Sequence, residues 1–417
     1  KHNDWNTFAY DKIFWSIREG FHPEYDVEEG ISVRDMHLGI LEPALLLKLV
    51  TLEQLGKKLI KTSEVIKYYT QVLDILEKFV PNLEMFIRMT DWTKHVSKIS
   101  YQGIPLNRDR AKWIYDNSNG LIRHLKPMRK ENPDLKRTIE AIEALSHWPS
   151  LEIQHPRYCS WGTSTSRNAH KSKTLIPGLR SWMRCLIDPP EGYVIHEHDY
   201  KSQEWLITGI LANDPRMISK YANGDVYMQL SNEFDLGDRS LGKQLSIAML
   251  YKAGTKPIKD LVGADKAKQI VRSFQYKYPD LIKYQKAIEY KHKSLETLTL
   301  PSGWSINAVG HTDGNYLNFQ SQGLGAEILR ECVKRIHDVG IKIIFTMHDS
   351  IACISKKEDL ESDHETVKRI MIDCANEILN TKLMRTDSVI IKHGDLWNHK
   401  NSRKTYEDIM KLNLEMN

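Results

Sequence analysis

Two short apolar runs, far apart in the chain, each lead to an aspartate, and together they limit the possible fold more than any other feature. The first runs from Tyr193 to Ile195 and continues to Asp199. The second occupies residues 341–347 and resumes at 351–354, with Asp349 between its two halves. Apolar runs of this length, rich in Ile and Val and bounded by polar residues, predict β-strands. The sequence therefore predicts a sheet with carboxylates at its strand ends, one of them in the turn of a hairpin.

The chain between these strands has a different pattern. Residues 205 to 295 show mainly helical periodicity, so a helical insertion is expected between the two parts of the sheet. The chain has 417 residues, more than one ordinary domain, and two or three packed units are expected. These features predict an α+β protein with an antiparallel sheet.

Two aspartates brought together at one end of a sheet would repel each other unless a cation lay between them. Asp199 and Asp349 therefore suggest the carboxylate pair that two-metal phosphoryl transfer requires. The alternative is that each is an ordinary turn residue, because aspartate is common where a strand ends.

A stripe of residues four apart lies between the strands. Arg239, Lys243, Ile247 and Tyr251 would share one face of a helix. The two cations could neutralise a triphosphate, while the aliphatic and aromatic residues offered a surface for a base. An amphipathic helix with lysine at its rim would give the same pattern.

Two further groups suggest nucleic-acid contacts. Asn318 and Gln322 would place two amides on one helix face, able to reach a minor groove, although polar residues near a helix start are also common caps. The segment from 95 to 150 is helical and basic, and a solvated helix face is the alternative to phosphate binding. Its crowded cations are Arg123, Lys126, Arg129, Lys130, Lys136 and Arg137.

Bulk composition adds little. The net charge of +5 is modest, so any nucleic-acid surface must come from local clustering. The five cysteines form no CxxC pair, which argues against structural zinc and a disulfide framework and favours a reducing cytoplasm. The most apolar stretch, Leu38 to Val50, is far shorter than the roughly 20 residues of a membrane span.

The order and spacing of these residues resemble the family A DNA polymerases, the group of bacterial DNA polymerase I and many phage replicases. Asp199 to Glu204 resembles motif A, DYSxxE, and positions 239–251 follow the RxxxKxxxFxxxY spacing of motif B. Met347 to Ser350 resembles the VHDE of motif C, and Asn318 to Gln322 the NxxxQG helix before it. The resemblance covers about residues 95 to 417 in order.

The resemblance implies template-directed DNA synthesis in phage replication, in which dNTPs are added to a primer 3′-hydroxyl and pyrophosphate is released. It implies two Mg²⁺ ions, with Mn²⁺ as a substitute, held by Asp199, Asp349 and the backbone carbonyl of Tyr200. Lys243 would be the proton donor to pyrophosphate and so a third catalytic residue. Primer–template DNA and dNTPs are the implied partners of a monomer, with replication accessory proteins as further candidates.

Roles for other residues follow from the same resemblance. Glu204 would lie under the sugar and exclude a 2′-hydroxyl, and Tyr251 would guard the templating base. The implied nucleotide contacts are Arg239, Lys243, Ile247, Tyr251, Glu204, Gln203, Tyr227 and Arg184. The implied DNA contacts are Arg167, Asn318, Gln322 and His348.

Four positions depart from the family pattern. Ile247 replaces the usual aromatic residue of motif B, and Lys252 stands where the family has Gly. Ser350 replaces the second acid of motif C, and Tyr227 replaces a His that usually touches the triphosphate. Because both aspartates are retained, we expect an active but divergent enzyme, more similar to a phage replicase than to a bacterial repair polymerase.

The implied architecture is a right-hand polymerase with an antiparallel palm sheet, helical fingers and a helical thumb. The expected units are a partial RNase H-like 3′–5′ exonuclease-type domain at 1–95, a thumb at 96–150, a first palm part at 151–204, fingers at 205–295 and a second palm part at 296–417.

The exonuclease resemblance of the first segment is weak. His2 to Asp11 resembles the HNxxFD segment of that domain, and Tyr68-Tyr69 resembles the final YxxxD, but Asp74 lies one residue too late. The first DxE motif is absent. If the chain is complete, we expect no exonuclease activity; if it is part of a longer protein, the missing acids lie elsewhere.

Two other functions fit parts of the sequence. A single-subunit phage-type RNA polymerase shares the two aspartates and a Lys-to-Tyr motif B, but a carboxylate at Glu204 would disfavour ribonucleotides. A catalytically silent polymerase-like DNA-binding module would not need both aspartates together with both cations of motif B.

Overall fold

The computed structural model describes residues 31–32, 59–60, 83–130, 135–145 and 148–412, the last range with gaps at 149, 157, 160–162, 171–175, 179–180, 253–255, 307, 310 and 398–401. The exonuclease-like assignments to Asp11 and Asp74 lie outside these residues. The two earliest described strands, β1 (Ile31–Ser32) and β2 (Leu59–Ile60), form an antiparallel pair.

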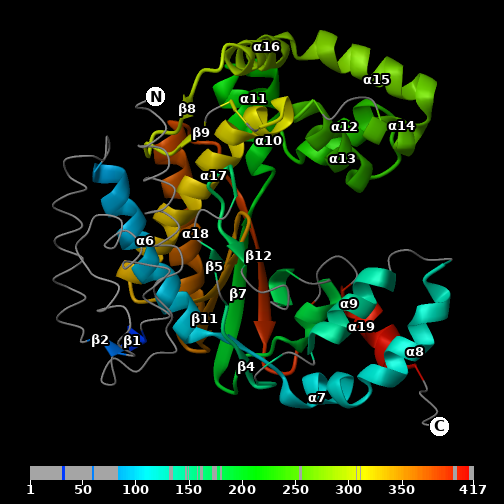
Figure 1. Cartoon of the computed structure of the whole chain (residues 1–417), viewed down its shortest axis with the longest axis vertical. Helices are drawn as coiled ribbons and strands as arrows, with labels where there is room; N and C mark the ends of the chain where they lie inside the picture. Colours follow the sequence, from blue (N-terminus) through cyan, green and yellow to red (C-terminus); the bar gives the residue numbers. More distant parts are fainter. Residues whose placement is uncertain are drawn as a thin grey trace.

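The centre of the molecule is a four-stranded antiparallel sheet in the order β10-β11-β7-β12 (Figure 1). Its strands are β7 (Tyr193–Tyr200), β10 (Lys342–Met347), β11 (Ser350–Lys356) and β12 (Thr386–Lys392). The predicted hairpin is confirmed as β10 and β11. Asp199 lies at the end of its strand as predicted, one residue before the last residue of β7, where β12, which the sequence analysis did not predict, pairs with β7 through Tyr200.

Side chains of this sheet alternate between two hydrophobic cores. Ile351 and Cys353 face a core that they share with α17 (Asp313–Asp338) and α18 (Leu360–Leu379). Ala352 and Ile354 face the opposite core, which contains Trp397. Because successive residues of a strand point to opposite faces, both faces of β11 are buried. Packing on both faces therefore fixes the position of the sheet and of the charged residues at its end.

Helical units flank the sheet at two places (Figure 1). The predicted helical insertion is confirmed as α10 (Gln203–Leu211), α11 (Pro215–Ala222), α12 (Val226–Glu233), α13 (Arg239–Leu250), α14 (Lys256–Val262), α15 (Ala264–Lys277) and α16 (Pro279–Lys293). The basic segment forms α7 (Arg108–Asp116), α8 (Ser118–Met128) and α9 (Leu135–Leu145), near α19 (Ser402–Met410). Helix α6 (Leu83–Gln102) packs on β10 and α17, and it crosses the boundary predicted at residue 95.

The remaining elements are short. They are β3 (Ile104–Pro105), β4 (Ile153–Gln154), β5 (Tyr158–Cys159), β6 (Ala169–His170), the 3-10 helices η2 (Ile176–Gly178) and η3 (Ser181–Leu186), β8 (Leu298–Thr299) and β9 (Ser305–Ile306). Within the described ranges, none of the helices combines the length and apolar character that crossing a membrane requires.

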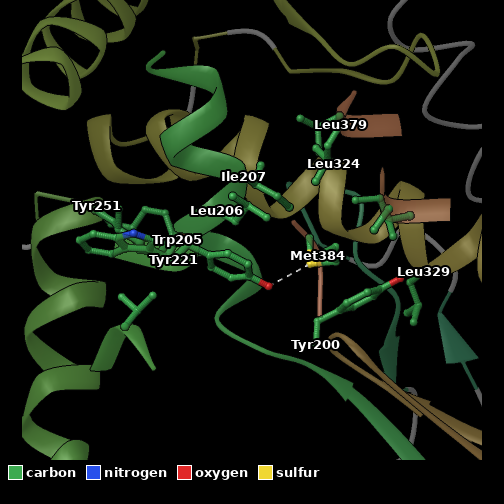
Figure 2. Close-up of a cluster of buried hydrophobic side chains, with 14 of the residues drawn as sticks. Tyr200, Trp205, Leu206, Ile207, Tyr221, Tyr251, Leu324, Leu329, Leu379 and Met384 are labelled. Carbon is green, nitrogen blue, oxygen red and sulfur yellow. Dashed lines mark hydrogen bonds between the residues drawn. The ribbon is translucent and has the colours of Figure 1, made fainter. Parts of the chain in front are cut away.

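The helical insertion is anchored to the sheet by a buried cluster of aromatic residues (Figure 2). Trp205 of α10 is fully buried, and its indole donates to the carbonyl of Met217 at 3.0 Å. The hydroxyl of Tyr221 contacts the sulfur of Met384 at 3.6 Å, and Tyr200 enters the same cluster from β7. The strand that carries Asp199 and the first helix of the insertion thus share one core.

Three imidazoles shielded from water, those of His196 and His198 in β7 and of His337 in α17, predict acid sensitivity. Burial lowers the pKa of His196 and His337 to about 4 and that of His198 to about 3. Because the unfolded chain binds these protons more readily, the free energy of unfolding should decrease as pH falls from about 6.5 towards 4, by up to roughly 3 kcal/mol per imidazole. Urea unfolding at pH 7, 6 and 5 measures this. His196→Phe should make the pH dependence shallower; an unchanged slope would contradict the assignment to His196.

Candidate active site

The predicted carboxylates meet at the end of the sheet nearest the helical insertion. Ser350 pairs directly with Asp199, so Asp349, the preceding residue, lies beside Asp199. The hairpin turn is tight, because His348 adopts a left-handed conformation with φ of 55°. Tyr200 fixes the strand on the other face by donating from its hydroxyl to the carbonyl of Met371 at 2.5 Å.

The electrostatics of this pair show crowding of negative charge. Burial, Asp349 and Glu197 together raise the pKa of Asp199 well above its usual range, and Lys243 opposes the shift. Burial also raises the pKa of Asp349, against the opposing effect of Arg167. A divalent cation would relieve this repulsion.

The residues fit a magnesium site of the open kind. Mg²⁺ is usually held by one or two carboxylates, with water and substrate phosphates as its other ligands. Among the residues that the structure describes, no cluster of three or more Asp, Glu, His or Cys side chains could enclose a metal ion. The carbonyl of Tyr200, the third expected ligand, belongs to a residue that lines the same cleft as the two aspartates.

The cationic stripe faces these acids across a cleft of about 840 Å³. Asp238 begins α13 by accepting from the backbone N–H groups of Ser240 and Leu241, and Tyr251 follows the helix end. Arg239, Lys243 and Ile247 line the cleft and are exposed. Three residues of the predicted stripe, Arg239, Lys243 and Ile247, thus lie on one helix face opposite Asp199 and Asp349, whereas Tyr251 does not line this cleft.

Tyr227 holds the cations of this stripe in place. The guanidinium of Arg239 lies 5.1 Å from the ring centroid of Tyr227, and the ammonium of Lys243 lies 5.7 Å from it. Arg239 also donates to Asp225 at 2.6 Å. Burial raises the pKa of Tyr227 to about 12, so its hydroxyl keeps its proton.

The backbones of α12 and α13 approach closely at Gly242, so one added methyl group there should reduce stability strongly. A Cβ at Gly242 would lie 2.0 Å from the carbonyl oxygen of Tyr227, so Gly242→Ala must force α12 and α13 apart. We expect a loss of about 2–3 kcal/mol in unfolding free energy, measured by urea titration, and weaker nucleotide binding. Gly314→Ala is the matched control, because a Cβ there meets nothing closer than 3.8 Å. Equal stability of the two variants would contradict the close approach.

Glu204 is fixed by two neighbours at the edge of the cleft. Arg167 donates to its Oε1 at 2.7 Å, and the hydroxyl of Tyr251 donates to its Oε2 at 2.5 Å. Burial raises the pKa of Tyr251 well above its usual value, which favours this donor role. Tyr251 itself is buried behind Glu204, where its hydroxyl also lies 3.3 Å from Ser321.

The four expected DNA contacts gather at a second hollow of about 390 Å³. Arg167, Asn318, Gln322 and His348 all line it, next to the hairpin turn. Asn318 Oδ1 is buried, and no described protein atom within hydrogen-bonding distance satisfies it. The four residues predicted to contact DNA therefore lie on one polar surface, formed by α17, the β10–β11 turn and the segment around Arg167.

Two expected nucleotide contacts, Gln203 and Arg184, pack against other parts of the protein. Gln203 is buried, with its Oε1 beside Gly325 of α17, although it also lines the cleft. Arg184 donates to both oxygens of Glu197 at 3.2 Å and lies 5.6 Å from the ring centroid of Trp397. A nucleotide role for either residue stays a prediction.

The sequence analysis missed Glu197. It lies two residues before Asp199 on β7, on the same face, and it lines the cleft although only 5% of it is exposed. The signal was a charged residue in the buried register of an apolar strand. Glu197 brings a third carboxylate close to the aspartate pair.

Comparison with known proteins agrees with this arrangement. Of the solved structures, the POL domain of Pol1 from M. smegmatis, in a complex with DNA primer-template and dNTP, superposes with a TM-score of 0.68 over 92% of this chain and 81% of that chain, at 12% identity. This chain has the fold of a DNA polymerase domain. The α+β right-hand architecture expected from the sequence is thereby confirmed for the described residues.

Sequence relatives give the same answer. The DNA polymerases of Mycobacterium phages D29 and L5 are 22% and 24% identical over 232 and 246 residues, which cover 51% and 55% of this chain. DNA polymerase I of Caldicellulosiruptor bescii is 23% identical over 282 residues, 60% of this chain and 32% of its own length. No protein-family model matches the chain.

These relatives are DNA polymerases, and the chain resembles a divergent family A polymerase, as the motifs indicated. The matches span only 38% and 39% of the lengths of the two phage polymerases.

Proposed function

We propose that this chain is a DNA-directed DNA polymerase that extends a primer with dNTPs in phage DNA replication. One observation carries the proposal: Asp199 on β7 and Asp349 in the adjoining β10–β11 turn face the cations of α13 across one cleft. A carboxylate pair opposite fixed cations matches the needs of a metal-bound triphosphate.

Each side chain then has a definite task. Asp199, Asp349 and the carbonyl of Tyr200 would hold divalent cations, Mg²⁺ in the first place, and bound cations would activate the primer hydroxyl and stabilise pyrophosphate. Arg239 would neutralise triphosphate oxygens. Lys243, the exposed cation that opposes the charge of Asp199, would donate a proton to the leaving pyrophosphate.

The fixed carboxylate of Glu204 supports selection of deoxynucleotides. Because Arg167 and Tyr251 hold it from both sides, Glu204 cannot rotate away from a 2′-hydroxyl without losing two charge-assisted hydrogen bonds. We therefore favour a DNA polymerase over a phage-type RNA polymerase.

Magnesium-dependent extension of a primed template, with each dNTP and then each rNTP offered separately, tests the proposal. We expect template-directed addition of dNTPs, no addition in EDTA, and far poorer use of rNTPs. Equal use of both nucleotide types would refute selection at Glu204. A complete lack of extension would refute the polymerase proposal and favour the catalytically silent DNA-binding module.

The basic segment should supply non-specific DNA affinity. Lys126, Arg129 and Lys130 are exposed at the end of α8. Changing all three to Ala should weaken primer–template binding and reduce the slope of log affinity against log salt by up to about 2–3. Fluorescence anisotropy at several salt concentrations measures this. Lys342, Lys356 and Lys357, exposed at the opposite end of the sheet, form the control triple. An unchanged slope would mean that the α8 cations are only a solvated face.

A further inference from the structure

Glu197 links β7, which carries Asp199, to β11, which begins directly after Asp349. The hydroxyl of Ser350, on β11, donates to its Oε1 at 2.9 Å, and Arg184 binds both of its oxygens. Ser350 also pairs in register with Asp199, and Ala352 with Glu197. Asp199, Glu197 and Ser350 therefore form one compact group at the floor of the cleft.

A carboxylate at this place is costly unless it has a purpose. Glu197 is almost completely buried, and its charge adds to the repulsion that Asp199 already experiences from Asp349. The ion pair with Arg184 offsets part of this cost. Water screens this pair only weakly, because 12% of the side chain of Arg184 and 6% of that of Glu197 are exposed. A serine or an alanine in this register would avoid the repulsion altogether.

The residue that holds Glu197 is also the residue that departs from the family motif. Position 350 usually carries an acid in motif C, and here it is Ser350. The serine side chain has no carboxylate, but its hydroxyl donates a hydrogen bond to the carboxylate of Glu197 on the neighbouring strand. A carboxylate from β7 thus lies in contact with the position where the family pattern has an acid.

We propose that Glu197 is a positioning residue of the cation site, which supplies from β7 the third negative charge that the family pattern places at position 350. This inference rests on the proposed function. Glu197 acts from behind Asp199 and Asp349, and it raises the affinity of the pair for divalent cations. The hydroxyl of Ser350 and the guanidinium of Arg184 hold its carboxylate in place.

Cation binding without turnover is the direct test. Mn²⁺ is titrated into the full chain, without DNA or dNTP, and the free ion is followed by electron paramagnetic resonance. Glu197→Gln keeps the shape of the side chain and should weaken Mn²⁺ binding roughly three- to tenfold. The Mg²⁺ concentration for half-maximal extension should rise by a similar factor, with kcat at saturating Mg²⁺ nearly unchanged. Glu191→Gln, an exposed site at the far end of the strand, is the control and should change neither.

The exchange of the two side chains provides a second test. Glu197→Ser should lose cation affinity, and adding Ser350→Glu in the same chain should restore it to within about twofold, because the third carboxylate returns from the other strand. If the Glu197–Arg184 pair were only structural, Glu197→Gln would lower the unfolding midpoint and leave Mn²⁺ affinity unchanged. That result, or a failure of the exchange to restore affinity in a folded protein, overturns the inference. Failure of the polymerase proposal would look different: wild type would not extend primers.

Discussion

Replacing Asp349 with Asn should reduce the rate of primer extension by at least about 10³-fold, while the protein stays folded and binds DNA. Asparagine keeps the shape of the side chain but removes the charge that would hold a cation opposite the stripe of α13. Asp199→Asn should have the same effect, because Asp199 and Asp349 are adjacent and each is needed for the site. Single-nucleotide extension under single-turnover conditions measures the loss.

Stability separates this loss of catalysis from unfolding. Because both aspartates have raised pKa values, their ionised forms are disfavoured in the metal-free protein. Removing one charge should therefore increase the unfolding free energy at pH 7 by about 1 kcal/mol, a trade of stability for function. DNA binding in EDTA should be equal or tighter, because repulsion between the site and phosphate falls. Retained extension by either variant would disprove the assignment of the carboxylate pair.

Lys243→Ala should lower the maximal rate of extension by about 10²- to 10³-fold, the usual contribution of a positioned proton donor. Lys243 is exposed in the cleft and reduces the repulsion at Asp199, so its loss removes both a donor and a charge. Arg239→Ala should mainly raise KM for dNTP, because Arg239 also donates to Asp225 and would contact phosphate rather than the leaving oxygen. Steady-state kinetics for each dNTP measures both values.

Gln244→Ala is the matched control for Lys243, because Gln244 is exposed on the same helix and does not line the cleft. It should leave the rate unchanged. If Lys243→Arg, which keeps the charge but rarely gives up a proton, extends primers as fast as wild type, Lys243 is an electrostatic contact and no proton donor.

Local pattern was sufficient for the hairpin, the helical insertion and the stripe at 239–251, because each depends on short-range periodicity and spacing. The same periodicity could not reveal β12. That strand alternates exposed and partly buried residues at the sheet edge, with Ile391 as its single buried residue, so its apolar signal is weak. Its pairing with β7 depends on long-range packing, which also extends β7 past Asp199.

The sequence by itself determined which side chains carry the proposed chemistry: the two aspartates, the cations of α13 and the amides of α17. Only the tertiary structure decided how they are used, because contacts between residues far apart in the chain have no local signature. It joined Glu204 to Arg167 and Tyr251, turned Arg184 towards Glu197, and brought Ser350 into contact with that same carboxylate. The contact between Glu197 and Ser350 depends on the register of β7 against β11, and that register is set by the two cores that bury the sheet.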